Sequence, residues 1–497
     1  MTAFVLRRRG LPDNGLWHDD AAPSLGAVKG SLSQLLTVSF DHPGFTLLLR
    51  AWWPLTGEDS LRLPYLALIA GTLSPPALYM VLCRLGFARS ISALLGAALV
   101  ASEMDIIYSE RVKTYTLDLL VVLGLALLVP VLARRSWRWQ SGVAWFAGAA
   151  VVGSVSVFAL IATAVAGVVL VLHSRSDRTV RVLAVGAQLV TSAVFVAAVH
   201  RTYDAQIVGT YWKRQLDGFL DFDLNPVRFG GEVVEHLTRV AIVFPGGPPW
   251  WATLCVLAAG VGLLVMARVG RNAVRARFLL LLALIAFAAA VVDKVPFGPK
   301  VGAPGNGGRV TLWLVPVMAF GLAAILQLGR HRIASRSPLR IAFDAVAFGV
   351  AIAVVTTALG RDAPQYPFPG SKSATRFVES ELGKRDVVFV LPGGRYAFAL
   401  DSDYALSLRE QPSRSVGFAP ESHDRRVSYF DSLFNPDRVA GQIERVLQGA
   451  DRVIIHAATG GAPEKWLYTL GLYRVQIGFT VERSVAFDAA RVVIWQR

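Results

Sequence analysis

Long apolar segments separated by short arginine-rich connections are the feature that most limits how this chain can fold. Of its 497 residues, 54% are hydrophobic and 17% are charged, and the mean hydropathy is +0.48. The apolar residues come in long blocks and are not scattered at the spacing of an amphipathic helix. This pattern excludes an ordinary soluble enzyme. It predicts a mainly α fold, a polytopic transmembrane helix bundle that has the lipid bilayer as a partner.

The lengths of the apolar blocks predict the number of spans. A bilayer core about 30 Å thick needs roughly 20 apolar residues in a helix to cross it. About ten blocks fit, near residues 61–85, 91–109, 114–133, 142–157, 157–173, 179–200, 248–268, 275–294, 309–329 and 339–360. The stretch 143–172 is too long for one crossing. Its small residues Gly153, Ser154 and Ser156 predict a tight turn that divides it into two helices.

The distribution of basic residues predicts the topology. Alternate connections carry sixteen arginines, which are Arg84, Arg89, Arg134, Arg135, Arg138, Arg175, Arg178, Arg181, Arg268, Arg271, Arg275, Arg277, Arg330, Arg332, Arg336 and Arg340. The other short connections carry only Arg111 with Lys113 and Lys294 with Lys300. The positive-inside rule places the arginine-rich set in the cytoplasm. We therefore expect a multi-pass protein of the cell (plasma) membrane, with residues 1–60, 104–113, 201–247, 293–308 and everything after 361 outside.

The formal net charge of +15 raises the question of a nucleic-acid partner. The basic residues lie mainly in short connections between apolar spans, without the interleaved aromatic residues of a nucleic-acid groove. We therefore expect no nucleic acid. Cys83 and Cys255 both fall within apolar spans, so we expect no disulfide, and sulfur chemistry implies no metal. No cofactor is predicted, and a dependence on divalent metal is left open.

The composition changes after Gly360, and this change defines the predicted domains. Residues 1–60 are an extracytoplasmic or interfacial segment, 61–360 the transmembrane domain, 361–373 a linker, and 374–497 a small extracytoplasmic α/β domain. In the last domain, strands are predicted at 387–391, 452–456 and 491–495, and helices at 374–382, 436–447 and 462–470. At the other end, the apolar residues 1–6 are too few to span a membrane, so we expect the natural gene product to begin further upstream.

Three polar elements fall on the predicted outer face. The first is the acidic pair Asp19-Asp20, which follows an aromatic residue and a histidine. The second is His42-Pro43, which leads into a short aromatic-rich segment that suits an interfacial helix. The third is the segment 108–115, Tyr-Ser-Glu-Arg-Val-Lys-Thr-Tyr. Charged groups at such a boundary line an aqueous cavity more readily than lipid.

The order of these elements resembles the lipid-linked-sugar glycosyltransferases of the GT-C fold. Arg62-Leu63-Pro64 at a span entry and Gly307-Gly308-Arg309 ahead of the span at 309–329 belong to the same pattern. The nearest branch is the bacterial one akin to protein mannosyltransferases and aminoarabinose transferases. The resemblance is best over roughly residues 16–135 and does not explain the C-terminal domain. It implies a hexosyl- or pentosyltransferase that moves a sugar from a polyprenyl-phosphate donor to a glycan, lipid or protein acceptor of the cell envelope.

The resemblance also implies roles for individual residues. Asp19 takes the place of the family's catalytic carboxylate, and Asp20 that of the acidic residue beside it; one carboxylate is enough to deprotonate an attacking hydroxyl. Positive charge at the donor phosphate would come from Arg111, Lys113 and Arg309. The residues expected at the substrates are His42, Tyr108, Glu110 and Tyr115. The family often has Glu where Arg111 stands, and Pro-Pro after the histidine.

Each of these residues also has a purely structural explanation. In that explanation the acidic pair is a solvated turn, the cations snorkel to the membrane interface, and His42 caps the interfacial helix. The connection 201–247, rich in aromatic and acidic residues, either closes over the acceptor or rests on the membrane. The C-terminal domain is either acceptor-binding or structural.

Two other classes of function stay open. A transporter or flippase would share ten spans and would depend on Asp118 and Asp344, the acidic residues identified within spans. A non-catalytic membrane scaffold would keep the fold without the activity. The Arg111 substitution and the missing first span make that alternative credible.

Overall fold

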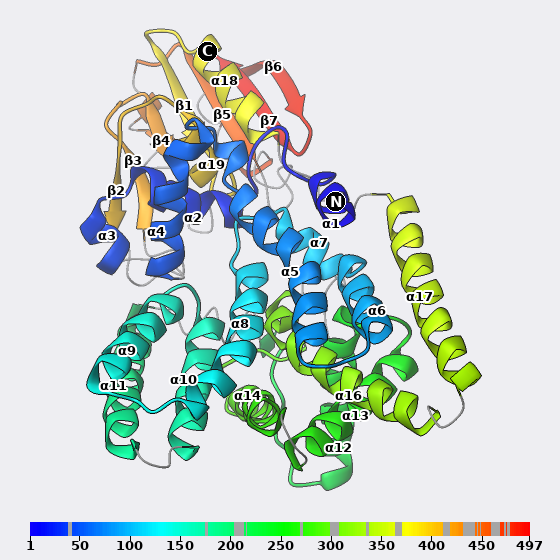
Figure 1. Ribbon diagram of the computed structural model, residues 1–497. Coiled ribbons are helices and arrows are strands. Elements are labelled where there is room, and N and C mark those ends of the chain that lie inside the picture. Colours follow the sequence, from blue (N-terminus) through cyan, green and yellow to red (C-terminus); the bar gives the residue numbers. More distant parts are fainter. Residues whose placement is uncertain are drawn as a thin grey trace. The chain divides into compact units, whose positions relative to one another are not determined.

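The computed structural model is a mainly helical chain with a small region of sheet near its C-terminus (Figure 1). It describes residues 1–37, 42–173, 177–202, 213–214, 216–268, 272–298, 308–333, 337–362, 370–410, 418–430, 443–444, 446–447, 449–458, 468–471, 474 and 478–497. The chain forms two compact units. The helical unit comprises residues 1–10 and 67–364, and the C-terminal unit comprises residues 11–66 and 365–497. The C-terminal unit thus unites most of the predicted segment 1–60 with the predicted α/β domain.

The helical unit follows the predicted order of apolar blocks. Its elements are α1 (Thr2–Arg8), α5 (Tyr65–Arg84), α6 (Arg89–Val100), α7 (Glu103–Ser109), α8 (Tyr115–Arg134), α9 (Trp139–Gly153), α10 (Val157–Leu172), α11 (Arg178–Thr202), α12 (Pro226–Val243), α13 (Pro249–Arg268), α14 (Ala273–Val291), η5 (Gly308–Leu314), α16 (Val315–Ile333) and α17 (Ser337–Gly360). A helix or a pair of consecutive elements lies at each of the ten predicted positions.

Seven helices in the described part of the chain are long and apolar enough to cross a membrane. They are Ser60–Arg84, Tyr115–Arg134, Arg178–Ala197, Pro249–Arg268, Ala273–Val291, Arg309–Ile333 and Pro338–Gly360. α6 and α7 pass the same test together but meet at a bend of 57°, as a broken span or a re-entrant loop does. α9 and α10 have 15 and 16 residues, fewer than the roughly 20 that a straight crossing needs. The chain is a multi-pass membrane protein.

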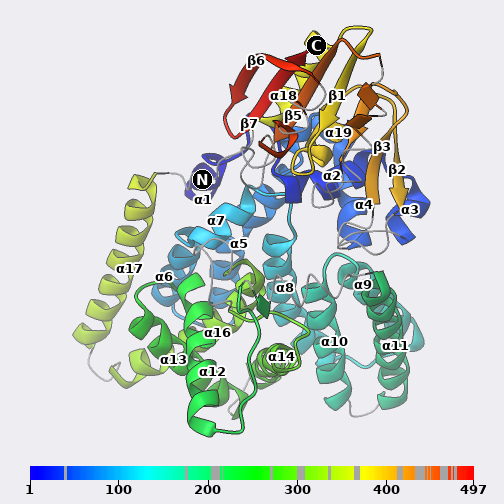
Figure 2. The same cartoon turned by 180° about the vertical axis from the view of Figure 1, so that it is seen from behind.

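The break between α9 and α10 lies where the sequence predicts it. α9 ends at Gly153, and Ser156 caps α10 by accepting a hydrogen bond from the backbone N–H of Ala159. The Ser156 hydroxyl also donates to the carboxylate of Asp118 in α8. α9 then packs beside α11, and the two lie side by side in both views (Figures 1 and 2). The predicted division of this block into two helices is confirmed.

α13 and α16 make the most extensive helix pair of the helical unit. A Cβ atom at Gly262 would lie 2.0 Å from the carbonyl oxygen of Gly321, and one at Gly321 would lie 2.2 Å from that of Ala259. No side chain fits between the two backbones at this crossing. Small residues are how membrane helices reach such close contact, because lipid offers little hydrophobic drive for association.

The C-terminal unit is an α/β structure. Its helices are α2 (His18–Lys29), α3 (Leu32–Thr37), α4 (Pro43–Trp52), η1 (Trp53–Thr56), η2 (Ser60–Arg62), α18 (Ser371–Glu381) and α19 (Arg395–Asp401). Its strands are β1 (Asp386–Val390), β2 (Leu406–Glu410), β3 (Phe418–Ser422), β4 (Val427–Tyr429), β5 (Arg452–Ala458), β6 (Thr480–Phe487) and β7 (Ala490–Gln496). Five strands form a sheet in the order β4-β1-β5-β7-β6, and β2 pairs with β3. β1 is parallel to β4 and β5, whereas β7 is antiparallel to β5 and β6.

The central strands β1, β5 and β7 of the five-stranded sheet are buried on both faces, as in an α/β fold, whereas the edge strand β6 is mostly exposed. α18 and α19 contribute Ala374, Val378 and Phe398 to the core on one face, and Phe430 and Phe479 lie in the core on the other. The predicted strands at 387–391, 452–456 and 491–495 and the helix at 374–382 are confirmed. The predicted helices at 436–447 and 462–470 lie mostly outside the described residues. β2, β3, β4, β6 and α19 were not predicted; β6 has eight residues, but most of its side chains are exposed and carry little apolar signal.

Candidate functional site

The segment 108–115, from the end of α7 to the start of α8, holds five of the predicted site residues. Ser102 caps α7 and donates a hydrogen bond to the carbonyl oxygen of Val243, which fixes the start of the segment. The side chains of Tyr108, Glu110 and Arg111 are buried, with exposed fractions of 1%, 3% and 4%. Lys113 and Tyr115 are half-buried at the start of α8. Buried polar groups at the mouth of an apolar bundle are unusual and mark a candidate site.

Arg309 joins this cluster, although it lies 201 positions after Tyr108 in the sequence. Its guanidinium Nη1 lies 3.3 Å from the hydroxyl of Tyr108 and donates a hydrogen bond to it. The Tyr108 and Tyr115 rings meet edge to face with centroids 5.1 Å apart. Beyond them, Phe158 stacks on Trp313 of η5 at 5.1 Å. The structure therefore brings Arg309 to the 108–115 segment, as the resemblance implied.

Two contacts from the N-terminal segment hold α7, and the sequence analysis did not identify them. The guanidinium of Arg7 is fully buried and forms an ion pair with the buried carboxylate of Asp105. It also donates to the carbonyl oxygen of Leu99 at 3.3 Å. The backbone N–H of Gly10 donates to Glu110 Oε1 at 2.9 Å. Arg7 of α1 and Gly10 just after it thus hold the segment that carries Tyr108 and Glu110.

The environment of Glu110 changes its acidity. Burial raises the pKa of Glu110 to about 8, although the N–H of Gly10 and the positive charges of Arg7 and Arg111 act in the opposite direction. Glu110 is therefore mostly protonated at neutral pH, and its protonated oxygen can donate a hydrogen bond. A Cβ atom at Gly10 would lie 2.2 Å from Glu110 Oε2, so only glycine fits here without a shift of that side chain.

A sequence signal for Arg7 and Asp105 existed. Asp105 lies within the predicted span 91–109, as Glu103 does, and is a further acidic residue in a span besides Asp118 and Asp344. A charged group in such a position is expected to have a partner of opposite charge. The arginine run at residues 7–9 offers that partner, but the pair is 98 residues apart and only the fold identifies it.

The acidic pair occupies the first turn of α2 in the C-terminal unit. Trp17 is the N-cap residue, so Asp19 and Asp20 lie in the first turn of α2, at the positive end of the helix dipole. Asp19 is exposed, whereas Asp20 is 1% exposed. The structure therefore separates the two carboxylates by environment: Asp19 is exposed to solvent, and Asp20 is enclosed. Among the described residues, no group of three His, Cys, Asp or Glu side chains could hold a metal ion.

His42 lies at the start of α4, also in the C-terminal unit. It is the N-cap residue ahead of Pro43, and it makes no side-chain capping hydrogen bond to that helix. The side chain is half-buried. The segment predicted to form an interfacial helix is helical: α4 and η1 cover residues 43–56. Asp19, Asp20 and His42 thus belong to one unit, and the other six candidate residues belong to the helical unit.

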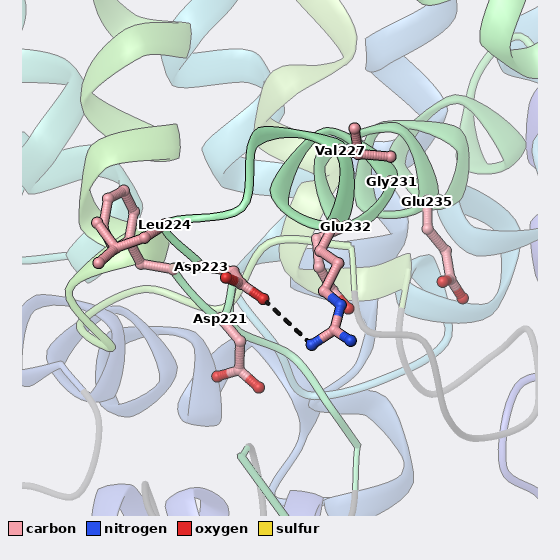
Figure 3. A pocket seen from close by; sticks show the side chains of 9 residues that line it. Asp221, Asp223, Leu224, Val227, Gly231, Glu232 and Glu235 are labelled. Carbon is pink, nitrogen blue, oxygen red and sulfur yellow. Dashed lines mark ion pairs between the residues drawn. The ribbon is translucent and has the colours of Figure 1, made fainter.

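The described part of the connection 201–247 forms an open pocket of about 590 Å³ (Figure 3). Residues 221–224 run beside one face of α12, where Asp223 pairs with Arg228 at 4.0 Å. The other acidic side chains that line it are Asp221, Glu232 and Glu235. The rings Tyr203, Tyr211 and Trp212, which prompted the prediction of a loop over the acceptor, lie outside the described residues. Phe222 and Leu224 are 63% and 89% exposed, which suits a segment at the membrane surface.

The two aspartates that a transporter would depend on are held by structural contacts. Asp118 accepts hydrogen bonds from Ser156 and from Thr114. Asp344 of α17 forms an ion pair with Arg330 of α16 at 2.8 Å and also accepts from Ser90. These contacts stabilise helix packing. They give ion coupling no particular support.

Known proteins resemble this chain at the level of structure. No protein-family profile matches the chain, and no curated protein sequence matches it. Among solved structures, ArnT from Cupriavidus metallidurans matches in its apo state and bound to undecaprenyl phosphate, in both cases with a TM-score of 0.54 and 13% identity. The alignments cover 99% of this chain and 95% and 96% of ArnT.

The chain has a GT-C-like fold. The predicted fold class, a membrane helix bundle of the GT-C type with a small C-terminal sheet region, is thereby confirmed. At 13% identity this match shows the fold alone, so the function of the chain must be argued from its own residues.

Proposed function

We propose that this chain is a membrane glycosyltransferase that moves a pentose or hexose from a polyprenyl-phosphate donor to a glycan, lipid or protein acceptor of the cell envelope, on the extracytoplasmic side. The observation that carries the proposal is the contact of Arg309 with Tyr108, which adds a third cation to the segment that holds Arg111 and Lys113. ArnT, which has the same fold, has been solved with undecaprenyl phosphate bound. That ligand supports a polyprenyl-phosphate donor for this chain.

The chemistry of donor cleavage fits a cluster of cations. The bond between the sugar C1 and the phosphate oxygen breaks, and the polyprenyl phosphate departs with one more negative charge than it had in the donor. Arg111, Lys113 and Arg309 would hold that phosphate and stabilise its developing charge. A protonated Glu110 leaves this positive potential undiminished at neutral pH. The Tyr108 hydroxyl accepts from Arg309 and the Tyr115 ring packs on Tyr108, so both side chains lie near this cation, which suits a site that binds the sugar of the donor.

The acceptor needs one base. As its oxygen bonds to C1, the acceptor hydroxyl loses its proton to a carboxylate. The exposure of Asp19 favours that residue as the base, and the enclosed Asp20 would support it. His42 would contact the substrate or orient the pair. The positive-inside rule places the arginine-rich connections in the cytoplasm. Residues 1–60 and those after 361 lie on the other side of the membrane by the same rule, which supports extracytoplasmic placement of the C-terminal unit.

Sugar release tests this proposal. The full-length chain in detergent is incubated with a panel of labelled polyprenyl-phosphate pentoses and hexoses, with cell-envelope acceptors supplied. We expect release from at least one donor and a loss of about a hundredfold or more in Asp19→Asn, since removing a general base typically costs 10²–10⁴-fold. Asp13→Asn, which neutralises an exposed carboxylate just ahead of α2, is the matched control and should behave as wild type.

Two outcomes would contradict the proposal. Release that is equal in wild type, Asp19→Asn and Asp20→Asn would remove the acidic pair from the reaction. A wild-type chain that releases sugar from no donor in the panel would favour the non-catalytic scaffold.

A further inference from the structure

Helix α2, which carries the acidic pair, is anchored at both ends on the short helix α19 of the same unit. At its C-terminal end, the ammonium of Lys29 donates hydrogen bonds to the carbonyl oxygens of Ala399 and Ser402 at 2.6 and 2.9 Å. At its N-terminal end, the His18 ring lies 3.2 Å from the carbonyl oxygen of Gly393, just ahead of α19. α2 and α19 make the most extensive helix contact in the C-terminal unit.

The contact with Gly393 fixes the state of the His18 ring. A carbonyl oxygen can only accept a hydrogen bond, so His18 Nδ1 must carry the hydrogen and donate it. The ring also packs against Tyr396, with centroids 5.1 Å apart and planes at 50°. The position and tilt of the His18 ring are therefore set by two groups of the α19 region. His18 is the residue immediately before Asp19.

Tyr396 is itself immobilised. Its side chain is fully buried, and its hydroxyl donates to the carbonyl oxygen of Phe418 at 3.2 Å. Arg395 Nη2 donates to the same hydroxyl at 2.7 Å, and the Arg395 guanidinium lies 4.6 Å from the centre of the Tyr396 ring. A buried charge with a short hydrogen bond restricts the ring more than packing alone does.

We propose that Arg395, Tyr396 and His18 form a positioning relay that holds the acidic pair in its working orientation. The proposal rests on the proposed function, in which Asp19 is the base. The sequence left two roles open for the C-terminal domain, acceptor binding and a structural role. In this proposal the domain supports the helix that carries the catalytic base. Arg395, Tyr396 and His18 act through α2 and are positioning residues.

Kinetics separate positioning from simple stability. A base displaced by about 1 Å can lose up to a hundredfold in rate while substrate affinity is kept. For His18→Ala we expect kcat for sugar release to fall at least tenfold, with the KM for the labelled donor within twofold of wild type. His18→Asn keeps an N–H donor close to the place of Nδ1 and should recover most of kcat. Tyr396→Phe loses both hydroxyl contacts, and its kcat should lie between those of His18→Ala and His18→Asn.

Two matched controls use the same unit. Lys29→Met removes the far anchor of α2, and Tyr429→Phe removes a tyrosine hydroxyl from β4. Both should keep wild-type kcat even if the unfolding temperature falls. The proposal is overturned if His18→Ala keeps wild-type kcat, or if Lys29→Met lowers kcat as much as His18→Ala does.

Hydrogen exchange gives a second readout that does not depend on activity. We expect amide exchange in residues 18–22 to be at least tenfold faster in His18→Ala and Tyr396→Phe than in wild type, with the sheet strands unchanged. Unchanged exchange in 18–22 would overturn the relay. If wild type releases no sugar, the proposed function fails, and the exchange result alone decides whether the relay holds α2.

Discussion

The two units hold their candidate residues by different means. In the helical unit, the 103–115 segment is fixed by buried charge in the Arg7–Asp105 ion pair and by the hydrogen bond from Gly10 to the enclosed Glu110. In the C-terminal unit, α2 is fixed on α19 by backbone carbonyl oxygens and ring packing. Buried charge is costly to create and very costly to leave unpaired, whereas carbonyl and ring contacts are each worth about 1 kcal/mol. Substitutions in the helical unit should therefore have the larger effects on stability.

The largest effect is expected for Arg7→Met. This change leaves the Asp105 carboxylate buried without its counter-charge, which typically costs about 3–5 kcal/mol. The unfolding temperature in detergent is the measurement. The double variant Arg7→Met, Asp105→Leu replaces both charges by apolar groups and should recover most of the loss. A single variant that loses less than about 1 kcal/mol would show that the pair does not hold α7.

A smaller loss is expected for Gly71→Ala, where α5 meets α7. The new Cβ would lie 1.8 Å from Ser109 Oγ and 2.8 Å from Ser109 Cβ, so the helices must separate. Overpacking of this kind costs about 1–3 kcal/mol. Gly124→Ala in α8 is the matched control, because a Cβ there meets nothing within 4 Å. It should be neutral or stabilising by about 0.5–1 kcal/mol, and equal results for the two variants would contradict the close approach.

The pH dependence of the helical unit should come partly from Glu110. Its pKa is about 8 in the folded chain and near its ordinary value of 4.5 when unfolded, so the folded state keeps a proton that the unfolded state releases between these values. This contribution to stability is fully present below about pH 4.5 and is lost as the pH rises towards 8. Glu110→Gln should flatten the fall in unfolding temperature between pH 5 and 8. An unchanged slope would contradict the raised pKa.

The opposite slope is expected for His456 in the C-terminal unit. This side chain on β5 is fully buried, and burial lowers its pKa from 6.5 to about 4. The unfolded state therefore binds a proton between pH 6.5 and 4 that the folded state excludes, and stability is lost as the pH falls through this range. His456→Asn should reduce the acid sensitivity of the C-terminal unit, followed by hydrogen exchange of β5 and β7. An unchanged acid transition would mean that another group controls it.

The sequence predicted the helical unit better than the C-terminal unit for a physical reason. Long apolar blocks specify membrane helices locally, and even the turn at Gly153 could be located from small polar residues. The packing of α2 on α19 joins residues 370 or more positions apart through carbonyl oxygens and a ring, which leave no local pattern. The same limit applies to Arg7 with Asp105. The sequence identified candidate residues where they form a contiguous motif, as in 108–115. It did not identify the distant residues that hold them in place.

Equilibrium binding of a labelled polyprenyl-phosphate sugar tests most directly the division of work between the cation cluster and the acidic pair. The full-length chain is compared with Lys113→Gln, Arg309→Gln and Asp19→Asn. The account predicts that each cation variant weakens donor binding by about tenfold or more, since charge-assisted contacts are worth about 1.5–3 kcal/mol. Asp19→Asn should bind the donor as wild type does and release sugar about a hundredfold or more slowly. Donor binding that is unchanged in both cation variants, or lost in Asp19→Asn, would contradict it.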